Sequence, residues 1–513
     1  MSLTDSSPTQ RARPKDWLGL AVLVLPALLL FMMLTILFLA IPQMAADLRP
    51  SSSQTLWIID IYGFLMAGLL VTMGTLGDRI GHRRLLITGA AVFAVVSVIA
   101  ATTSDPAMMI VWRAVLGIAA ATQMPATLGL IFSTFTDPRQ RGLAVGIWSG
   151  GISVGTALGP VIGGALLEAF SWRAAFLVAV PVMVIVAIGA PLLPNPRNPA
   201  AGRLDLFSVA LTLATLLPIV YGVKELGKDG RLAVAVAAIV IGLAFGAWFV
   251  VRQLRLPEPL LDVRLFANRV VSGALGVFLL AATALGGVYL LITQYLQLVQ
   301  GLSPLQAGLW VLAVAALLVL VSTASPILAR RFRPGRLIAT GLAVQVAGYL
   351  MLTQVGAVGG LPLLVAGFIV LYPAVAPSMA LTTNLVVGSA PPQKAGAASG
   401  LATTCSDLGI SLGIAIIGSI AAAVYRGQVA AGLPAGLPPE AAAASRDSLD
   451  GALTAAQTLP GELGAAVLAP AREAFAAGLT TAAVIAAVIA AAAAVLALRR
   501  LGVIPPTGNT PGH

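Results

Sequence analysis

Three charged residues lie inside long apolar segments of the sequence: Asp60, Arg113 and Asp407. A charged side chain in such a segment is costly, and it usually faces a cavity or a charged partner. Desolvation favours the neutral form of a carboxylic acid, so a buried acid is suited to take up and release a proton. The three residues are therefore candidates for proton coupling.

The depth of each charge in its segment refines this hypothesis. Asp407 lies about eleven residues into its segment, or roughly 16 Å at 1.5 Å per residue, which is near the middle of a spanning helix. We expect it to couple protons or to bind a cation; the alternative is a carboxylate that hydrogen-bonds Ser406 or Thr404 and only packs. Asp60 and Arg113 differ in depth by about 3 Å, so we expect them to interact. The alternative for Arg113 is a structural ion pair.

The sequence offers little for other kinds of chemistry. One cysteine, Cys405, and two histidines, His82 and His513, allow no internal disulfide and no cysteine or histidine metal cluster. No set of nucleophile, base and orienting residue is visible, and no basic run exceeds two residues. We therefore expect no enzyme activity, no metal, no cofactor and no nucleic-acid partner.

The composition predicts which elements position these residues. The 513 residues are 58% apolar and 10% charged, against about 45–50% and about 25% in soluble domains. Fourteen apolar blocks are long enough to cross about 30 Å of hydrocarbon as helices. They cover approximately 18–42, 55–76, 84–102, 106–131, 141–167, 173–194, 206–224, 232–253, 270–297, 305–329, 336–355, 361–386, 396–424 and 475–498.

The distribution of basic residues predicts the orientation of these spans. With the N-terminus in the cytoplasm, 21 of the 30 Lys and Arg fall in cytoplasmic segments and 8 in external segments. Cytoplasmic loops carry the excess of Lys and Arg in membrane proteins. We therefore expect fourteen spans in a lipid bilayer, with both termini cytoplasmic.

The loop between the second and third blocks carries a recognisable motif. It resembles the signature loop of the major facilitator superfamily, in which glycines allow a tight turn and arginines hold the loop at the membrane face. The resemblance implies that this loop latches two helix bundles together on the cytoplasmic side. The matching residues are Gly74, Asp78, Arg79, Gly81, Arg83 and Arg84.

The fifth block repeats small residues at helical spacing. Small residues four apart let helices approach closely, and a proline removes one helix hydrogen bond. The string resembles the antiporter motif of drug exporters, and Arg113 resembles the superfamily's span-four arginine, to which a role in proton transfer is assigned. The residues of the string are Gly155, Gly159, Pro160, Gly163 and Gly164.

The resemblance extends over nearly the whole chain and narrows the family. The segments 57–62, 171–173, 261–266 and 407–409 recur together in fourteen-span drug:proton antiporters. The likeness is closest to the Qac-type exporters of quaternary ammonium compounds and dyes. It implies an all-α integral membrane protein with the major facilitator fold. The expected parts are a cytoplasmic tail (1–17), an N-terminal six-helix bundle (18–194), two inserted spans (206–253), a C-terminal six-helix bundle (270–498) and a cytoplasmic tail (499–513).

One part of this organisation stays open in the sequence. The segment 425–474 is long, rich in Ala, Gly and Pro, and expected on the extracytoplasmic side within the C-terminal bundle. Its alanine-rich pieces allow a short helical hairpin, and the alternative is a floppy loop.

The chain also departs from the Qac-type pattern. Met33 stands where those exporters carry an acid in the first span, Leu318 stands near their acid in the tenth, and Ala402 and Thr403 replace their paired glutamates. With fewer acids in the spans, we expect monovalent lipophilic cations or neutral amphiphiles as substrates and poor transport of divalent cations.

Apolar, aromatic and polar residues of the spans are candidates for a substrate cavity. Methionine adapts its shape to varied ligands, and aromatic faces attract cations. The alternative for any one of them is contact with lipid or ordinary packing. The candidates are Met33, Phe38, Trp57, Tyr62, Gln123, Trp148 and Thr403.

These observations predict proton-coupled efflux of lipophilic drugs by alternating access. We expect the partners to be a small-molecule drug, protons and the lipid bilayer of a bacterial cell membrane, and we expect a monomer. A second hypothesis is a dedicated exporter of one antibiotic or metabolite that confers self-resistance. A third is a membrane sensor with a transporter fold that transports nothing.

Overall fold

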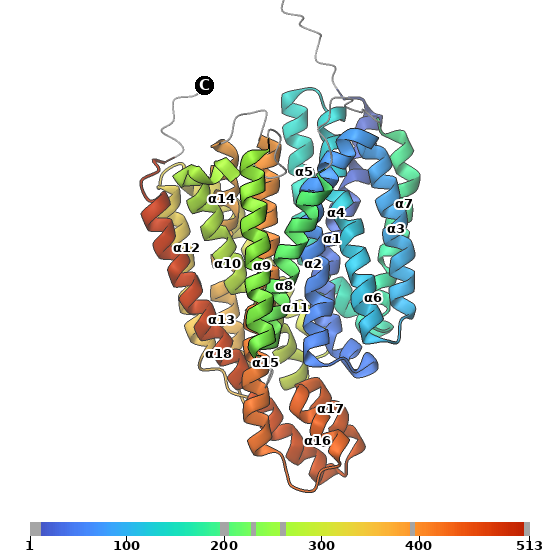
Figure 1. Ribbon diagram of the computed structural model, residues 1–513, viewed down its shortest axis with the longest axis vertical. Helices are drawn as coiled ribbons and strands as arrows, with labels where there is room; N and C mark the ends of the chain where they lie inside the picture. The colour runs from blue at the N-terminus through green and yellow to red at the C-terminus, as the bar shows by residue number, and fades with distance from the viewer. Residues whose placement is uncertain (1–11, 195–204, 227–231, 257–262, 390–394, 507–513) are drawn as a thin grey trace, which may run out of the picture.

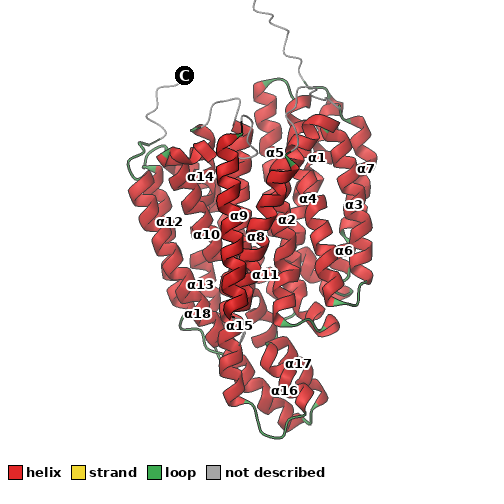
Figure 2. Cartoon of the chain, viewed as in Figure 1, coloured by secondary structure: helices red, strands yellow, loops and turns green. Residues whose placement is uncertain are grey.

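The computed structural model describes residues 12–194, 205–226, 232–256, 263–389 and 395–506. Within these ranges the regular secondary structure is helical and includes no strand (Figure 2). Fourteen helical segments are long and apolar enough to cross a membrane. The prediction of an all-α protein with fourteen spans is therefore confirmed. Residues 1–11 and 507–513 of the expected tails lie outside the described ranges.

The first half of the chain forms a helical bundle, blue to teal at one side of Figure 1. Within it α1 packs on α5, α2 on α4, and α3 on α4 and α7. The helices are α1 (Pro14–Leu48), α2 (Ser52–Ile80), α3 (His82–Thr102), α4 (Pro106–Thr134), α5 (Pro138–Ala169), α6 (Ala174–Leu177) and α7 (Ala179–Gly189).

The starts of these helices follow from local side chains. The Ser51 hydroxyl accepts a hydrogen bond from the Gln54 amide at the start of α2, and Asp105 accepts one from the Ala107 amide at the start of α4. Asp137 does the same for Gln140 at the start of α5. Such caps satisfy backbone N–H groups that have no partner in the first turn of a helix.

The second half forms another bundle, in which α10 packs on α15 and α18, and α12 packs on α13 and α18. Its helices lie on the opposite side of Figure 1. They are α10 (Arg269–Gln294), the π-helical turn η3 (Tyr295–Val299), α11 (Pro304–Ala329), α12 (Pro334–Leu352), α13 (Leu361–Ala374), α14 (Ala376–Gly388), α15 (Ala395–Gly432) and α18 (Gly461–Leu501).

Two further helices, α8 (Leu206–Leu226) and α9 (Leu232–Arg255), lie between the bundles in Figure 1. α8 packs on α9, on α2 and on α15, so it touches both bundles. The outer face of α9 carries exposed apolar side chains such as Val240 and Leu243, as expected for a helix that faces lipid.

Two of the predicted spans are each divided into two helices. The block 173–194 contains α6 and α7, and the block 361–386 contains α13 and α14. Each break lies four residues or fewer before a proline, Pro181 or Pro377. A proline has no N–H to donate to the carbonyl four residues earlier, and its ring crowds that carbonyl. The helix is interrupted there for that reason.

The segment 425–474 is folded, and the helical hairpin is the alternative that the structure supports. Within it lie α16 (Pro439–Asp447) and α17 (Leu449–Thr458), which project from one end of the molecule in Figure 1. α17 packs on α18, and the Tyr425 hydroxyl donates to the Ser445 carbonyl at 2.8 Å. We call this the hairpin end; α1 begins and α18 ends at the opposite, termini end.

Candidate functional site: a central cavity and a buried charge network

A large cavity lies between the two bundles. It encloses about 1270 Å³ with its open mouth included, and its wall combines residues of α1 and α5 with residues of α10, α11, α13, α14 and α15. Most of the wall is apolar, and the hydroxyl groups of Thr35, Thr156, Ser322, Thr323 and Ser406 are placed around it. Cavities of this kind, mostly apolar with a few polar groups, are typical of small-molecule binding sites.

Asp407 is a carboxylate in the wall of this cavity. The residue is 9% exposed, and its Oδ2 atom is buried with no hydrogen-bond partner among the described residues. Neighbouring Thr404 also has a buried hydroxyl without a hydrogen bond in that part of the chain. The Oδ2 atom is therefore not bonded to the Thr404 hydroxyl, and the Asp407 side chain lines the space that a ligand would fill.

Glycines explain why α15 brings Asp407 to this place. A Cβ atom at Gly409 would lie 2.7 Å from the Ala282 Cβ and from the Leu279 carbonyl of α10. A Cβ at Gly413 would meet the Thr283 carbonyl oxygen. Only a residue without a side chain allows the two helix backbones to approach so closely.

Aromatic rings form the wall of the cavity toward the hairpin end. Phe38 of α1 meets Tyr289 of α10 edge-on with ring centroids 5.2 Å apart, so this contact joins the two bundles. Tyr289 stacks on Tyr372 of α13 at 5.6 Å, and Phe368 completes the cluster. Aromatic faces attract organic cations, so the cluster and Asp407 together present two kinds of cation-binding group.

A second charged group lies buried within the first bundle. The Arg113 Nε of α4 donates to the Ile58 carbonyl at 2.9 Å, and its guanidinium lies 4.4 Å from the Tyr62 ring centroid. Asp60 is 1% exposed and lies within Coulomb range of Arg113. Tyr62 in turn is near enough to Arg113 and to Asp407 to interact electrostatically with both.

Close packing of α2 and α4 makes this arrangement possible. A Cβ at Gly117 would lie 2.6 Å from the Tyr62 carbonyl oxygen, so a larger residue would separate the helices. The structure thus places the Arg113 guanidinium against the Tyr62 ring, with Asp60 of the same helix α2 nearby.

The remaining cavity candidates lie in different places. Phe38 is in the cavity wall, whereas the Gln123 amide donates to the Leu86 carbonyl of α3 and the Trp148 indole to Thr127 of α4. Met33 is 6% exposed within the core, and Trp57 packs on the cluster of Phe64, Val220 and Ala415. The side chain of Thr403 lies outside the described residues.

The sequence analysis missed Tyr289 and Tyr372, which line the cavity. Their rings and hydroxyl groups are a signal in the sequence, but a weak one, since the same spans also hold Phe278, Tyr295 and Phe368. Leu318, which stands near an acid of the Qac-type pattern, also lines the cavity. Because Leu318 carries no charge, Asp407 is the one carboxylate that the described residues contribute to the cavity wall.

The predicted latch loop connects α2 to α3. Gly81 has a φ of 97°, which favours glycine, and the Asp78 carboxylate lies 2.9 Å from the His82 Nε2. Arg83 donates to the Leu193 carbonyl at 2.9 Å after α7. Arg79 and Arg84 are exposed, and a Cβ at Gly74 would lie 3.6 Å from Pro125. The bonds described here hold the loop to its own bundle.

The glycines of the fifth span are contact points for two other helices. A Cβ at Gly155 would meet the Leu28 carbonyl, and one at Gly159 would meet the Thr35 hydroxyl. A Cβ at Gly163 would lie 2.7 Å from Ile36, so all three face α1. Gly164 and Pro160 instead face α11 of the other bundle, at Leu305 and Gly308.

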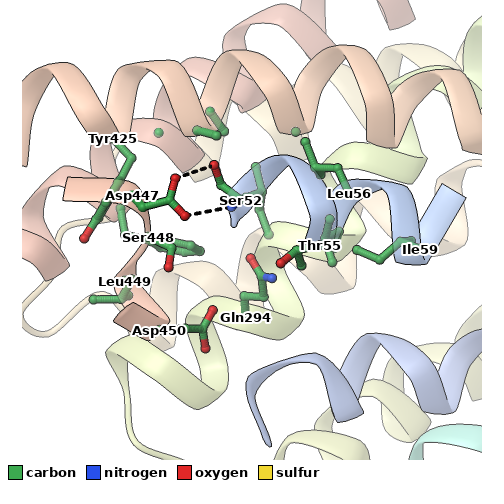
Figure 3. A pocket seen from close by; sticks show the side chains of 17 residues that line it. Ser52, Thr55, Leu56, Ile59, Gln294, Tyr425, Asp447, Ser448, Leu449 and Asp450 are labelled. Carbon is green, nitrogen blue, oxygen red and sulfur yellow. Dashed lines mark hydrogen bonds between the residues drawn. The ribbon is translucent and has the colours of Figure 1, made fainter. Parts of the chain in front are cut away.

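Contacts between the bundles close the hairpin end. Besides the α5–α11 contact, the Ser303 hydroxyl donates to Glu168 at 3.3 Å. In the hairpin, Asp447 accepts hydrogen bonds from the Ser52 amide at 2.8 Å and the Ser52 hydroxyl at 3.1 Å (Figure 3). The mouth of the central cavity therefore lies on the termini side of these contacts, where Thr323 and Met379 line it.

A fold of two helical bundles around a cavity with a buried carboxylate defines a membrane transporter. A family model described as the Major Facilitator Superfamily matches residues 23–414, and the chain belongs to this superfamily. Its members are transporters and not enzymes.

Three relatives are similar over almost their entire length. The multidrug efflux pump LfrA of Mycolicibacterium smegmatis is 43% identical, over 93% of this chain and 94% of the relative. The methyl viologen resistance protein SmvA of Salmonella typhimurium is 35% identical, over 90% and 93%. The tetracenomycin C resistance and export protein of Streptomyces glaucescens is 32% identical, over 96% and 93%.

Solved structures agree on the fold. A bacterial homologue of the human lysosomal transporter Spinster, in an inward-facing and occupied conformation, superimposes with a TM-score of 0.68. The match covers 96% of this chain and 98% of that structure at 17% identity. This likeness supports the major facilitator fold.

Proposed function

We propose that this chain exports lipophilic drugs from the bacterial cell in exchange for protons, by alternating access. The observation that carries the proposal is Asp407, whose buried Oδ2 atom has no hydrogen-bond partner among the described residues and whose side chain lines a cavity of about 1270 Å³. The names of three relatives that cover most of the chain, a multidrug pump and two resistance proteins, support the export of drugs.

Asp407 is the proposed site of exchange. A carboxylate that holds a proton is neutral and attracts a cation weakly, whereas an ionised carboxylate attracts a cation strongly. Proton and cationic substrate therefore exclude each other at Asp407. Binding of a proton from outside releases the substrate, and loss of that proton to the cytoplasm prepares the site for the next substrate.

Asp60, Arg113 and Tyr62 are the proposed link between protonation and the opening of the hairpin end. Arg113 bridges the α2 backbone at Ile58 and the face of Tyr62. Tyr62 lies within Coulomb range of Asp407 as well. A change of charge at Asp407 or Asp60 alters the field at Tyr62 and Arg113, and hence the packing of α2 on α4.

The proposed substrates are monovalent lipophilic cations and neutral amphiphiles. One carboxylate balances one positive charge, and the aromatic cluster of Phe38, Tyr289 and Tyr372 adds cation–π attraction. Among the described residues of this wall, a second buried positive charge would lack a counter-ion. Methyl viologen, for which the relative SmvA is named, is a dication, so the proposal predicts that this chain exports it poorly, and strong export of it would contradict the proposed substrate class.

The proposed setting is the plasma membrane, with the termini end in the cytoplasm and the protein acting as a monomer. The basic residues support this orientation, since 21 of 30 lie on the side of the termini. The cavity then opens to the cytoplasm in this structure. The proposed moving units are the two bundles, 18–194 and 270–498. The inserted spans 206–253 lie between them, the tails are 1–17 and 499–513, and the segment 425–474 lies at the outer surface.

A second candidate function is export of a single antibiotic. The tetracenomycin C exporter supports it, since it is 32% identical and aligns with 96% of this chain. A panel of unrelated dyes and antibiotics separates the two. Protection against several classes supports a multidrug pump, and protection against one supports a dedicated exporter.

Efflux from energised cells tests the proposal. Cells loaded with a fluorescent monovalent cation should export it, and a protonophore should abolish the export. Asp407→Asn should lower the rate at least about tenfold, because each 1.4 kcal/mol of lost interaction is a factor of ten. Glu440 is an exposed acid outside the cavity, so Glu440→Gln is the matched control. Normal export by Asp407→Asn, or export that survives the protonophore, would contradict the proposal.

A further inference from the structure

We propose that a pocket under the hairpin binds a small organic cation from outside, and that the bound cation holds the hairpin end closed. The ligand class is a quaternary ammonium ion smaller than the proposed drugs. The site lies apart from the central cavity, so it goes beyond the proposed function. Its effect on export rests on that function and on the proposed orientation, in which the hairpin end faces outward.

This hairpin pocket encloses about 650 Å³ with its open mouth included (Figure 3). Its wall combines the start of α2 with parts of α10, α15 and α18, and residues 447–450 of the hairpin complete it. Among the described residues, none lines both this pocket and the central cavity. Gly418 in its wall follows Asp407 by eleven residues on α15, which is roughly 16 Å along the helix. The two cavities are therefore separate sites.

A tight turn between α16 and α17 places two acids at the pocket. The Ser448 hydroxyl accepts a hydrogen bond from the Gly451 amide at 3.1 Å and so caps the start of α17. A Cβ at Gly451 would meet the Ala444 carbonyl of α16, so a residue without a side chain is needed where the two helices cross. Asp447 before the turn and Asp450 after it both line the pocket.

The two acids differ in their partners. Asp447 accepts hydrogen bonds from the amide and the hydroxyl of Ser52, and Arg426 donates to the same hydroxyl at 3.1 Å. The half-buried Asp450 carboxylate makes no hydrogen bond or ion pair with another described residue. Asp447 therefore fastens the hairpin to α2, whereas the charge of Asp450 is left for a ligand.

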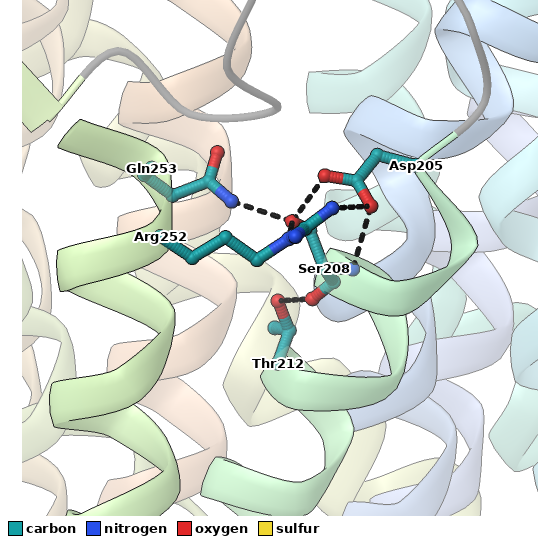
Figure 4. Close-up of polar contacts among 5 residues, drawn as sticks. All are labelled: Asp205, Ser208, Thr212, Arg252 and Gln253. Atoms are coloured by element: carbon teal, nitrogen blue, oxygen red, sulfur yellow. Dashed lines mark hydrogen bonds and ion pairs between the residues drawn. The ribbon is translucent and has the colours of Figure 1, made fainter. Parts of the chain in front are cut away.

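A carboxylate with a structural role has partners, as Asp205 before α8 illustrates. It accepts from the Arg252 Nη2 at 2.9 Å and from the Ser208 amide at 3.0 Å (Figure 4). The Ser208 hydroxyl also accepts from Gln253 at 2.6 Å, so this network ties the start of α8 to the end of α9. Asp450 has no comparable network among the described residues. A partly buried charge without partners is costly, so it indicates a place for a ligand of opposite charge.

The rest of the wall defines the kind of cation. The rings of Tyr425 and Phe475 line the pocket, and aromatic faces attract organic cations. Most other side chains of the wall are aliphatic or small, such as Leu56 and Leu290. The described residues hold no group of three acids, histidines or cysteines that could bind a metal ion. One carboxylate, two rings and an apolar wall fit a small quaternary ammonium ion.

A ligand in this pocket would join the two bundles. Ser52 and Thr55 of α2 face it from the first bundle, and Gln294 of α10 faces it from the second. Opening of the hairpin end separates α2 from α10 and α15 and so takes the pocket apart. A ligand shifts the equilibrium toward the conformation that it binds. We therefore expect an external cation to slow export.

Binding to purified protein tests the site without transport. Asp407→Asn is the parent, because it removes the charge of the central cavity. Choline is the probe, and the alcohol in which carbon replaces the choline nitrogen is the uncharged control ligand. At about pH 8, above the pKa of about 7 that burial gives Asp450, calorimetry in detergent should detect about one choline per protein. The control ligand should bind at least about tenfold more weakly.

Variants of this parent locate the bound choline. Asp450→Asn should weaken choline binding at least about tenfold, whereas Glu462→Gln, which changes an exposed acid outside the pocket, should leave it unchanged. Phe475→Leu keeps the apolar bulk but removes a ring, and it should weaken binding about threefold. No choline binding by the parent, equal binding of the uncharged ligand, or full affinity in both Asp450→Asn and Phe475→Leu would overturn the inference.

Export from energised cells tests the effect of the bound cation. External choline should slow the efflux of a fluorescent monovalent cation at least about twofold in wild type and in Glu462→Gln, and it should have little effect in Asp450→Asn. The uncharged ligand should slow none of them. Choline that binds through Asp450 but does not slow export would overturn the claim that it holds the hairpin end closed. If wild type exports nothing, the proposed function fails, while the binding result still decides whether the site exists.

Discussion

At the scale of single residues, isolated charge in an apolar context proved the most informative signal. Asp407 stands out in the sequence because few acids lie inside the spans, and the structure places it in a cavity wall. Tyr289 and Tyr372 could not be selected in the same way. Tyrosine is common in spans, and only the packing of α10 against α13 decides which rings meet. The type of a residue indicates which chemistry it can do, whereas the fold decides which side chains lie next to it.

The Asp60–Arg113 pair leads to a prediction about coupling. Because both act through Tyr62 and α2 in the proposed mechanism, Asp60→Asn and Arg113→Gln should each lower efflux at least about tenfold. The double variant should be no worse than the poorer single variant, because residues of one network are not additive. Efflux rates normalised to membrane expression check this. Independent defects that multiply in the double variant would count against the link.

At the scale of helices, apolar length predicted fourteen spans correctly but not their interruptions or extensions. The breaks shortly before Pro181 and Pro377 leave the apolar pattern intact, so composition alone does not reveal them. The hairpin of α16 and α17 is rich in alanine, and its folding depends on burial of residues such as Leu449 against the bundle. Such contacts are visible only in three dimensions.

The glycines of α5 allow a matched stability experiment. A Cβ at Gly155 would meet the backbone of Leu28, whereas one at Gly146 of the same helix would meet nothing within 4 Å. Gly155→Ala should destabilise the protein by about 1–3 kcal/mol, as overpacked sites do. Gly146→Ala should be neutral or stabilising by about 0.5–1 kcal/mol, because alanine favours helices. Thermal unfolding in detergent measures both, and equal effects would contradict close packing of α5 on α1.

The hairpin should respond to pH through Asp450. This residue lies in the first turn of α17, outside the spans, and burial raises its pKa to about 7 from a usual value of 3.8. The neutral form is therefore the one that the docked hairpin favours. Docking is strongest below the usual pKa of 3.8, and it weakens as pH rises from there to about 7, because in this range the carboxyl group ionises only when the hairpin is undocked.

Distances between two spin labels can follow this change. Labels at the exposed positions Ala443 and Ser104, in a Cys405→Ala background, report the position of the hairpin relative to the first bundle. Their distance distribution should broaden between about pH 4 and pH 7 in the parent protein. It should remain constant in Asp450→Asn, which cannot ionise. A pH response that survives this substitution would assign the effect to another group.

At the scale of the whole molecule, the structure is closed at the hairpin end and open toward the termini end. The contacts that close it include Phe38 with Tyr289, Gly164 with Leu305, and Ser52 with Asp447. Export requires these contacts to separate while new contacts form at the termini end. In this account, proton and drug control that exchange by competing for Asp407.

Proton release on drug binding is the most direct test of this competition. Purified protein in weakly buffered detergent solution is mixed with tetraphenylphosphonium, and a pH-sensitive dye follows the protons. Wild type should release up to about one proton per bound cation, because the cation and the proton exclude each other at one carboxylate. Asp407→Asn should release none at matched occupancy. Binding without proton release by wild type, or equal release by Asp407→Asn, would contradict the central claim.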